Sequence, residues 1–243
     1  MKIVFVGPTL ADATAAAAKD IVVRPPAVQG DILRATRSGA TAIGIIDGNF
    51  EYVAPIWHKE ILFALSHGIR VVGAASMGAL RAAECADFGM VGVGRIFQQY
   101  VSGELEDDSD VALLHGPAEL GYLPLTLPLV NVLATLEHLQ EAGGVSPEER
   151  AELEGVARRV FYKERTWSEI IRRAQLSPER SKTAFVGTLK SGTVDQKRED
   201  ALELLDLLAH ADNKHTTQPS SWTFQATSMW KTVLNTSGGG HSG

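Results

Sequence analysis

The chain has 243 residues, of which 44% are hydrophobic and 21% are charged, and this composition excludes disorder of the whole chain. The single cysteine, Cys85, excludes an intramolecular disulfide and a zinc site built on several thiols. A net charge of −6, the lack of a signal-peptide pattern and the lack of a long apolar segment predict a cytoplasmic protein with neither nucleic acid nor membrane as partner.

The first part of the chain alternates short apolar runs with segments of helical periodicity. Strands are expected in the opening run before Gly7 and at residues 21–24, 42–46 and 69–73. Helices are expected at residues 31–38, 55–67 and from Gly78 to about Ala86. Alternation at this spacing predicts an α/β fold, with a mostly parallel, Rossmann-like sheet covered by helices on both faces.

Helical patterns dominate after residue 125. They cover residues 129–141, 147–162, 167–175, 178–189 and 195–211. We therefore expect an α/β domain at 1–125, a mainly α-helical region at 126–236 and a flexible tail at 237–243. An acidic block at 104–110 and a basic stretch at 158–190 are typical of solvated faces, although both could dock oppositely charged proteins.

Ser76 stands where the fourth strand should end and the next helix should begin. Ala74 and Gly78 place small residues on both sides of it, as in a nucleophile elbow, the sharp turn that exposes a catalytic serine hydroxyl. The Met77 N–H would then lie at a helix N-terminus and could stabilise an oxyanion, with Gly78 in the same turn and Thr9 in a neighbouring loop. The same small residues would equally permit close packing of the helix on the sheet.

A base for Ser76 should come from the edge of the sheet where the carboxyl ends of parallel strands meet. Lys59 is a candidate because it lies off the apolar stripe of its helix and near the positive end of the helix dipole, which would lower its pKa. His58 is the alternative base, since neutral imidazole is the usual partner of a serine. Three further residues could support this chemistry: Asp47, Glu84 and His115.

Motifs for cofactors are absent from the sequence. No dinucleotide fingerprint or zinc-binding helix is present, and residues 187–193 have glycines at P-loop spacing without the lysine that contacts phosphate. The sequence therefore predicts neither a cofactor nor a metal, and nucleotide binding is only weakly supported.

Five blocks of residues, taken in order, resemble the TfuA-like family. They are residues 57–62, 73–84, 88–94, 105–108 and 115–119, with a weaker echo at 194–198. The resemblance extends over about residues 1–135. It implies a partner of YcaO enzymes, which use ATP to activate an amide when thioamides are formed in the backbone of ribosomally made peptides or proteins.

The resemblance also implies a reaction. TfuA-like proteins are understood to release sulfide from the thiocarboxylated C-terminus of a small ThiS-like carrier protein through a serine–lysine pair, and to help YcaO engage its substrate. On this chain the pair would be Ser76 as nucleophile and Lys59 as base. The alternatives are a non-catalytic module that binds or activates YcaO, with Ser76 only structural, and, more distantly, a phosphate- or nucleotide-binding domain.

Overall fold

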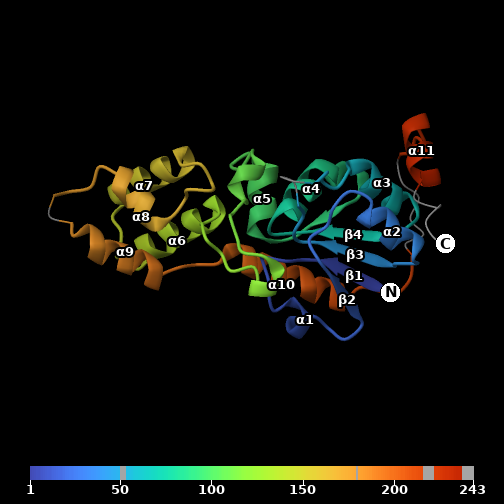
Figure 1. Cartoon of the computed structure of the whole chain (residues 1–243), viewed down its shortest axis with the longest axis horizontal. Helices are drawn as coiled ribbons and strands as arrows, with labels where there is room; N and C mark the ends of the chain where they lie inside the picture. The colour runs from blue at the N-terminus through green and yellow to red at the C-terminus, as the bar shows by residue number, and fades with distance from the viewer. Residues whose placement is uncertain (50–52, 179, 216–221, 237–243) are drawn as a thin grey trace.

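The computed structural model describes residues 1–49, 53–178, 180–215 and 222–236, and these residues form a five-stranded parallel sheet (Figure 1). The strands lie in the order β2-β1-β3-β4-β5. Their bounds are β1 Lys2–Phe5, β2 Ile21–Arg24, β3 Ala42–Ile45, β4 Arg70–Gly73 and β5 Val91–Gly92. Because the chain adds β2 on one side of β1 and the later strands on the other, a topological switch point lies between β1 and β3.

Helices cover both faces of this sheet, which confirms the α/β prediction. Every residue of β1 and β3 is buried, as expected for central parallel strands. One face carries α2 (Asp31–Arg37), α3 (His58–Ser66) and α4 (Met77–Cys85) (Figure 1). The other face carries α1 (Ala13–Ala16) and α10 (Gln196–Ala209).

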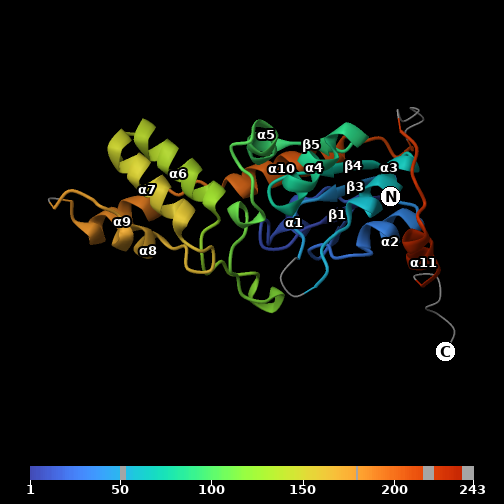
Figure 2. The ribbon, with the colours of Figure 1, turned by 90° about the horizontal axis from the view of Figure 1, so that it is seen from above.

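Four helices form a separate group beside the sheet (Figure 2). They are α6 (Leu129–Glu141), α7 (Pro147–Arg159), α8 (Trp167–Arg173) and α9 (Lys182–Ser191). Their buried side chains share one hydrophobic cluster with α5 (Gly94–Ser102), which connects this group to the sheet. The prediction of a mainly helical second half is therefore confirmed. No described helix is both long and apolar enough to cross a membrane.

α10 leaves this helical group and packs on the sheet. Leu204 and Leu208 of α10 contact the sheet where Gly44 of β3 has no side chain, and a Cβ added there would lie 2.6 Å from Leu208 Cδ1. The expected boundary at residue 125 stays a prediction, and residues 237–243 lie outside the described residues. The sequence pattern identified α10 as a helix without indicating which surface it covers.

The remaining elements are short. They are three 3₁₀ helices, η1 (Ala86–Phe88), η2 (Asp108–Asp110) and η3 (Ala118–Leu120), and the C-terminal helix α11 (Ser228–Thr236). None of these elements was predicted from the sequence, and neither were β5 and α5. β5 has two residues, which is too short to produce an alternating hydrophobic pattern.

Candidate active site

Ser76 lies in the turn between β4 and α4. The preceding residue, Ala75, has a φ of +66°, in the left-handed region that residues with a Cβ seldom adopt. The Ser76 N–H donates to Ala74 O at 2.7 Å, which closes a strained three-residue turn of the γ type. Ser76 is also the N-cap residue of α4, yet its hydroxyl does not cap the helix. The turn thus has the sharp geometry of a nucleophile elbow.

Close packing accounts for the glycines around this turn. A Cβ on Gly78 would lie 1.8 Å from Ile45 O, and a Cβ on Gly73 would lie 2.1 Å from Gly78 O. The approach of α4 to β3 and β4 therefore requires glycine at both positions, whatever the role of Ser76. The glycines support the elbow geometry without being evidence for catalysis.

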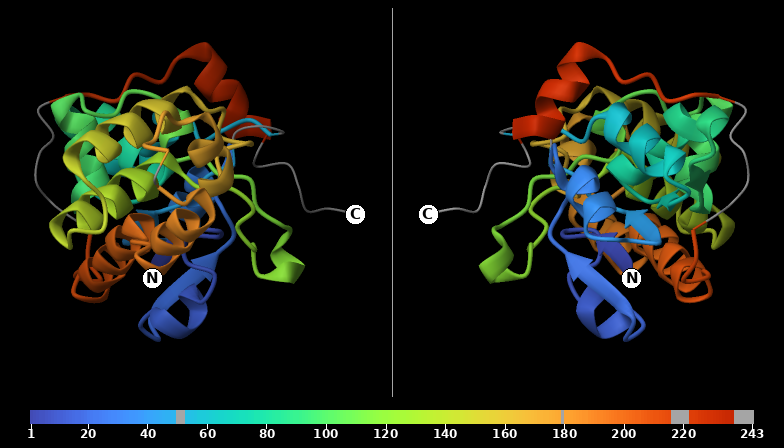
Figure 3. Two further views of the ribbon diagram at one scale, coloured as in Figure 1. Left: turned by 90° about the vertical axis from the view of Figure 1, so that its left-hand side faces the viewer. Right: turned by 90° about the vertical axis from the view of Figure 1, so that its right-hand side faces the viewer.

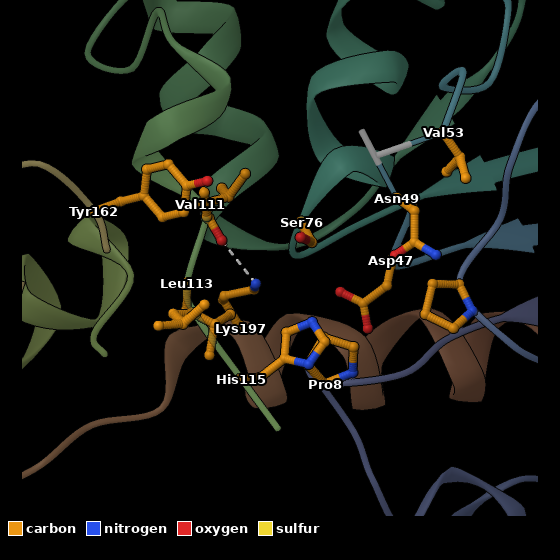
Figure 4. Close-up of a pocket in the computed structure, with 14 residues that line it drawn as sticks. Pro8, Asp47, Asn49, Val53, Ser76, Val111, Leu113, His115, Tyr162 and Lys197 are labelled. Carbon is orange, nitrogen blue, oxygen red and sulfur yellow. Dashed lines mark hydrogen bonds between the residues drawn. The ribbon is translucent and has the colours of Figure 1, made fainter. Parts of the chain in front are cut away.

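A pocket of about 270 Å³ opens beside Ser76 at the carboxyl ends of the strands. Its walls come from the loops that follow β1, β3 and β4, from residues 111–115 and from the start of α10 (Figure 4). This is the switch point of the sheet, where open parallel sheets bind their ligands. Figure 4 shows the Ser76 hydroxyl and the Lys197 amine directed toward the same space.

Lys197 is the amine that the fold brings to this pocket. The residue is 2% exposed, and its Nζ donates to Val111 O at 2.8 Å. Burial lowers the pKa of Lys197, and the negative charge of Asp47 acts in the opposite direction. Lys197 is also the second residue of α10, where the positive end of the helix dipole disfavours the ammonium form. At neutral pH a larger fraction of this lysine is therefore free amine than for an exposed lysine.

The position of Lys197 depends on α6. The side-chain oxygen of Asn131 accepts the Lys197 N–H at 3.1 Å, and the Asn131 amide donates to Asp195 Oδ1 at 2.9 Å. Asp195 in turn caps α10 by accepting the Arg198 N–H at 3.1 Å. The first turn of α10 is thus fixed both by its own cap and by a neighbouring helix.

Asp47 joins two of the loops that form the pocket. Its Oδ2 accepts the N–H groups of Gly7 at 2.8 Å and Thr9 at 3.0 Å, and its Oδ1 accepts the Thr9 hydroxyl at 2.5 Å. The carboxylate therefore holds the loop after β1 against the end of β3. The donors of Thr9 are both directed to Asp47, so Thr9 shapes the pocket and has no donor left for an oxyanion.

The backbone beside Ser76 offers one donor for a developing negative charge. The Gly78 N–H donates to Ile46 O at 3.2 Å. In the described part of the chain, no backbone hydrogen bond outside the helices and strands is donated by the Met77 N–H. As the first N–H of α4, it has no partner within the helix. Met77 is therefore better suited than Gly78 to hold an oxyanion.

Comparison with known proteins identifies the region that contains this turn. The family model described as "TfuA-like protein" matches residues 47–166. These residues belong to the TfuA-like family. No curated protein matches the chain. The TfuA-like region begins at Asp47, contains Ser76 and the 111–115 segment, and ends before α10.

Lys59 belongs to the TfuA-like region but does not line the Ser76 pocket. Its Nζ lies over the ring of Phe224, 4.8 Å from the ring centroid, on the side of α3 that faces the C-terminal segment. The next residue, Glu60, is buried and accepts the Gly30 N–H at 2.8 Å, so the first turn of α3 contacts the start of α2. The expected meeting of Ser76 and Lys59 is not found here, and Lys59 as base stays a prediction.

His58 also lies outside the lining of this pocket. Its Nε2 is 2.7 Å from Glu84 Oε2, and the same carboxylate pairs with Arg81 Nη1 at 2.5 Å. Burial raises the pKa of Glu84, but the hydrogen bonds from His58 and Arg81 outweigh this effect and lower it. Glu84 thus holds the His58 ring in a contact outside the Ser76 pocket. The only proposed supporting side chains in the described lining are Asp47 and His115.

His115 lines the pocket opposite Ser76, as Figure 4 shows. Its Nδ1 is 2.7 Å from Gly116 O, and its ring packs edge-on against Tyr122 with 5.6 Å between ring centroids. Both contacts fix the ring at the pocket entrance. A supporting role for His115 at this pocket stays a prediction.

Lys197 was not among the site residues predicted from the sequence, although two signals pointed to it. The residue lies within the weak TfuA-like echo at 194–198. It also shares the apolar face of α10 with Ala201, Leu204 and Leu208, at helical spacings of four, seven and eleven residues. A lysine within a buried stripe is unusual and often functional.

The described residues contain no group of three or more His, Cys, Asp or Glu side chains arranged to hold a metal ion.

Proposed function

We propose that this protein is a hydrolase that releases sulfide from a thiocarboxylated carrier protein for a YcaO enzyme in peptide-backbone thioamidation, with Ser76 as nucleophile and Lys197 as base. The observation that carries the proposal is the pocket itself, because Ser76 and Lys197 line it together. Ser76 stands at a strained turn and its hydroxyl does not cap α4, while the Lys197 side chain is buried. The TfuA-like family assignment supports the substrate class. Lys197 replaces Lys59, which the sequence favoured.

Each group in the proposed mechanism has a defined task. Lys197, as free amine, takes the proton of the Ser76 hydroxyl while Oγ attacks the thiocarboxylate carbon. The Met77 N–H donates to the oxygen that becomes negative. When the C–S bond breaks, sulfur leaves with the proton from Lys197 as HS⁻, and an acyl-serine ester remains. Water, deprotonated by the same amine, hydrolyses this ester and releases the carrier as its carboxylate.

In the structure, the Lys197 amine donates to Val111 O. Catalysis requires the Nζ to leave this acceptor and turn toward Ser76. Hydrogen bonds of catalytic groups often tighten only when substrate is bound, so this resting position is compatible with a role as base.

The test is sulfide release by the purified protein from a thiocarboxylated ThiS-like carrier, measured without YcaO. Wild-type protein should release sulfide, whereas Ser76→Ala and Lys197→Ala should lose about 10²-fold or more of the rate. Lys59→Ala is the matched lysine control and should retain the rate. A loss in Lys59→Ala with retention in Lys197→Ala would return the role of base to Lys59.

The second candidate is a non-catalytic module that binds or activates YcaO. It is favoured by one observation, namely that helix packing alone requires Gly73 and Gly78. It predicts no sulfide release by the isolated protein and normal support of thioamidation by Ser76→Ala. The assay without YcaO therefore separates the two functions directly.

A further inference from the structure

Residues 113–126 form an ordered hairpin-like loop at the entrance of the Ser76 pocket, and we call it the mouth loop. Its two arms are connected by hydrogen bonds from Gly116 N to Leu123 O at 2.9 Å and from Leu125 N to Leu114 O at 2.8 Å. The Thr126 hydroxyl accepts the Leu114 N–H at 2.7 Å. The start of the loop lines the pocket, while η3 at its tip stands away from the rest of the chain (Figure 3).

The mouth loop exposes an unusual amount of apolar surface. Its large exposed hydrophobic residues are Leu114, Leu120, Leu123 and Leu125, of which Leu120 is 67% exposed and Leu123 is 59% exposed. Glu119 is the single charged residue of the loop. Isolated exposed leucines are common, but several on one ordered segment at a pocket entrance are typical of a protein-binding surface.

Acidic residues border this apolar surface. The sequence contains no Lys or Arg between Arg95 and Arg150. The acidic block just before the mouth loop supplies Glu106, Asp107 and Asp108 to the wall of a second cavity, where the basic side chain of Arg81 is paired with Glu84. Val111 lines both this cavity and the Ser76 pocket, so the acidic block lies next to the start of the mouth loop, at residue 113. The surface is complementary to an apolar patch bordered by basic residues.

We propose that the mouth loop is the docking surface for the protein whose C-terminal tail enters the Ser76 pocket, and that this protein presents an apolar patch with neighbouring Lys or Arg residues beside the tail. The inference rests on the proposed function. A pocket of about 270 Å³ has room for a short extended tail only. The folded body of the carrier must then remain outside, over the residues that form the entrance.

A second copy of this chain fits the surface less well. In a two-fold symmetric dimer the same surface meets itself, which would bring the two acidic borders together without a basic residue from the same segment to pair with them. Charge therefore favours a different protein as the occupant.

The test combines binding and turnover. Leu120→Ser/Leu123→Ser changes two exposed side chains that do not line the pocket, and Met229→Ser, 64% exposed on α11, is the matched control. Calorimetric titration gives the Kd for a ThiS-like carrier in its unmodified carboxylate form. Sulfide release gives kcat/KM for the thiocarboxylated carrier and for a thiocarboxylated hexapeptide of the same tail. Circular dichroism verifies that each variant is folded.

We expect the double variant to bind the carrier about tenfold more weakly or worse, with a matching fall in kcat/KM for the carrier and no change for the hexapeptide. Met229→Ser should match wild type in all three measurements. An unchanged Kd in the double variant, or a wild-type protein that does not bind the carrier, overturns the docking surface. A change in oligomeric state in the double variant also overturns the proposal, because the mouth loop would then be an interface between two copies of this chain. If the wild-type protein releases no sulfide from either the carrier or the hexapeptide, the proposed function is refuted, while the Kd still decides the docking surface.

Discussion

Replacing Lys197 with methionine separates a catalytic amine from a structural one. Methionine keeps the length and apolar stem of lysine, so the packing of α10 on the sheet is preserved, while the amine is lost. If Lys197 is the base, sulfide release should fall by about 10²- to 10⁴-fold, which is the usual contribution of a general base.

The stability of this variant should not fall with its activity. The lost hydrogen bond from Nζ to Val111 O costs about 1.5–3 kcal/mol if the amine is charged. Relief from burying an ammonium returns a comparable or larger free energy, on the order of several kcal/mol. The difference in free energy of unfolding between Lys197→Met and wild type depends on pH. Because burial lowers the pKa of Lys197, the stability that the variant gains over wild type is greatest below that lowered pKa, and it disappears as pH rises to the ordinary lysine value.

Thermal unfolding at pH 7 and sulfide release from the thiocarboxylated carrier check both expectations. Lys2→Met is the control, since Lys2 is a second buried lysine that donates to Ala209 O at 2.7 Å and pairs with Asp20 at 3.0 Å. Lys2→Met should lose stability and keep its turnover rate per folded molecule. The assignment is refuted if Lys197→Met keeps its activity, or if its Tm falls by more than that of Lys2→Met.

Three further predictions concern the same site. Lys59→Ala should leave kcat/KM for sulfide release within about twofold of wild type and remove only the half-buried contact with Phe224; a larger loss would place Lys59 in the reaction. The pH profile of kcat/KM should rise through a pKa below the ordinary lysine value of about 10.4, because the free amine is the active form and burial lowers the pKa of Lys197; no acid limb, or one at the ordinary value, would contradict this. Gly78→Ala should lower the free energy of unfolding by about 1–3 kcal/mol, since its Cβ meets Ile45 O, and an unchanged denaturation midpoint would show that α4 can shift freely.

The α/β half was predictable because its strands carry local signals. The runs at 21–24 and 42–46 are apolar, rich in β-branched residues and bounded by Gly or Pro, and they became β2 and β3 with nearly the expected bounds. Parallel pairing and switch-point geometry followed from the alternation of strands and helices. The position of Ser76 at the end of β4 was predictable for the same reason.

The amine that shares the pocket with Ser76 was not predictable by the same reasoning. The carboxyl ends of parallel strands meet at one edge of the sheet, and this predicts the position of residues in the loops that follow the strands. Asp47 was in this way correctly predicted to lie at the pocket. This rule does not state which way a side chain on the following helix points, and Lys59 points toward Phe224. Lys197 belongs to α10, whose apolar stripe indicates that one face of the helix is buried. The stripe does not indicate which surface that face covers, and only tertiary packing decides that α10 covers β3.

The stretch of chain between Ser76 and Lys197 has a consequence for dividing the protein into parts. All of the α6–α9 group lies between them in the chain, and Asn131 of that group holds the backbone of Lys197. A truncation after residue 166 would retain the serine turn and discard Lys197, the proposed base. The α6–α9 group therefore determines where the Lys197 amine lies relative to Ser76. Insertions in this group should change the rate of turnover before they change the structure of the sheet.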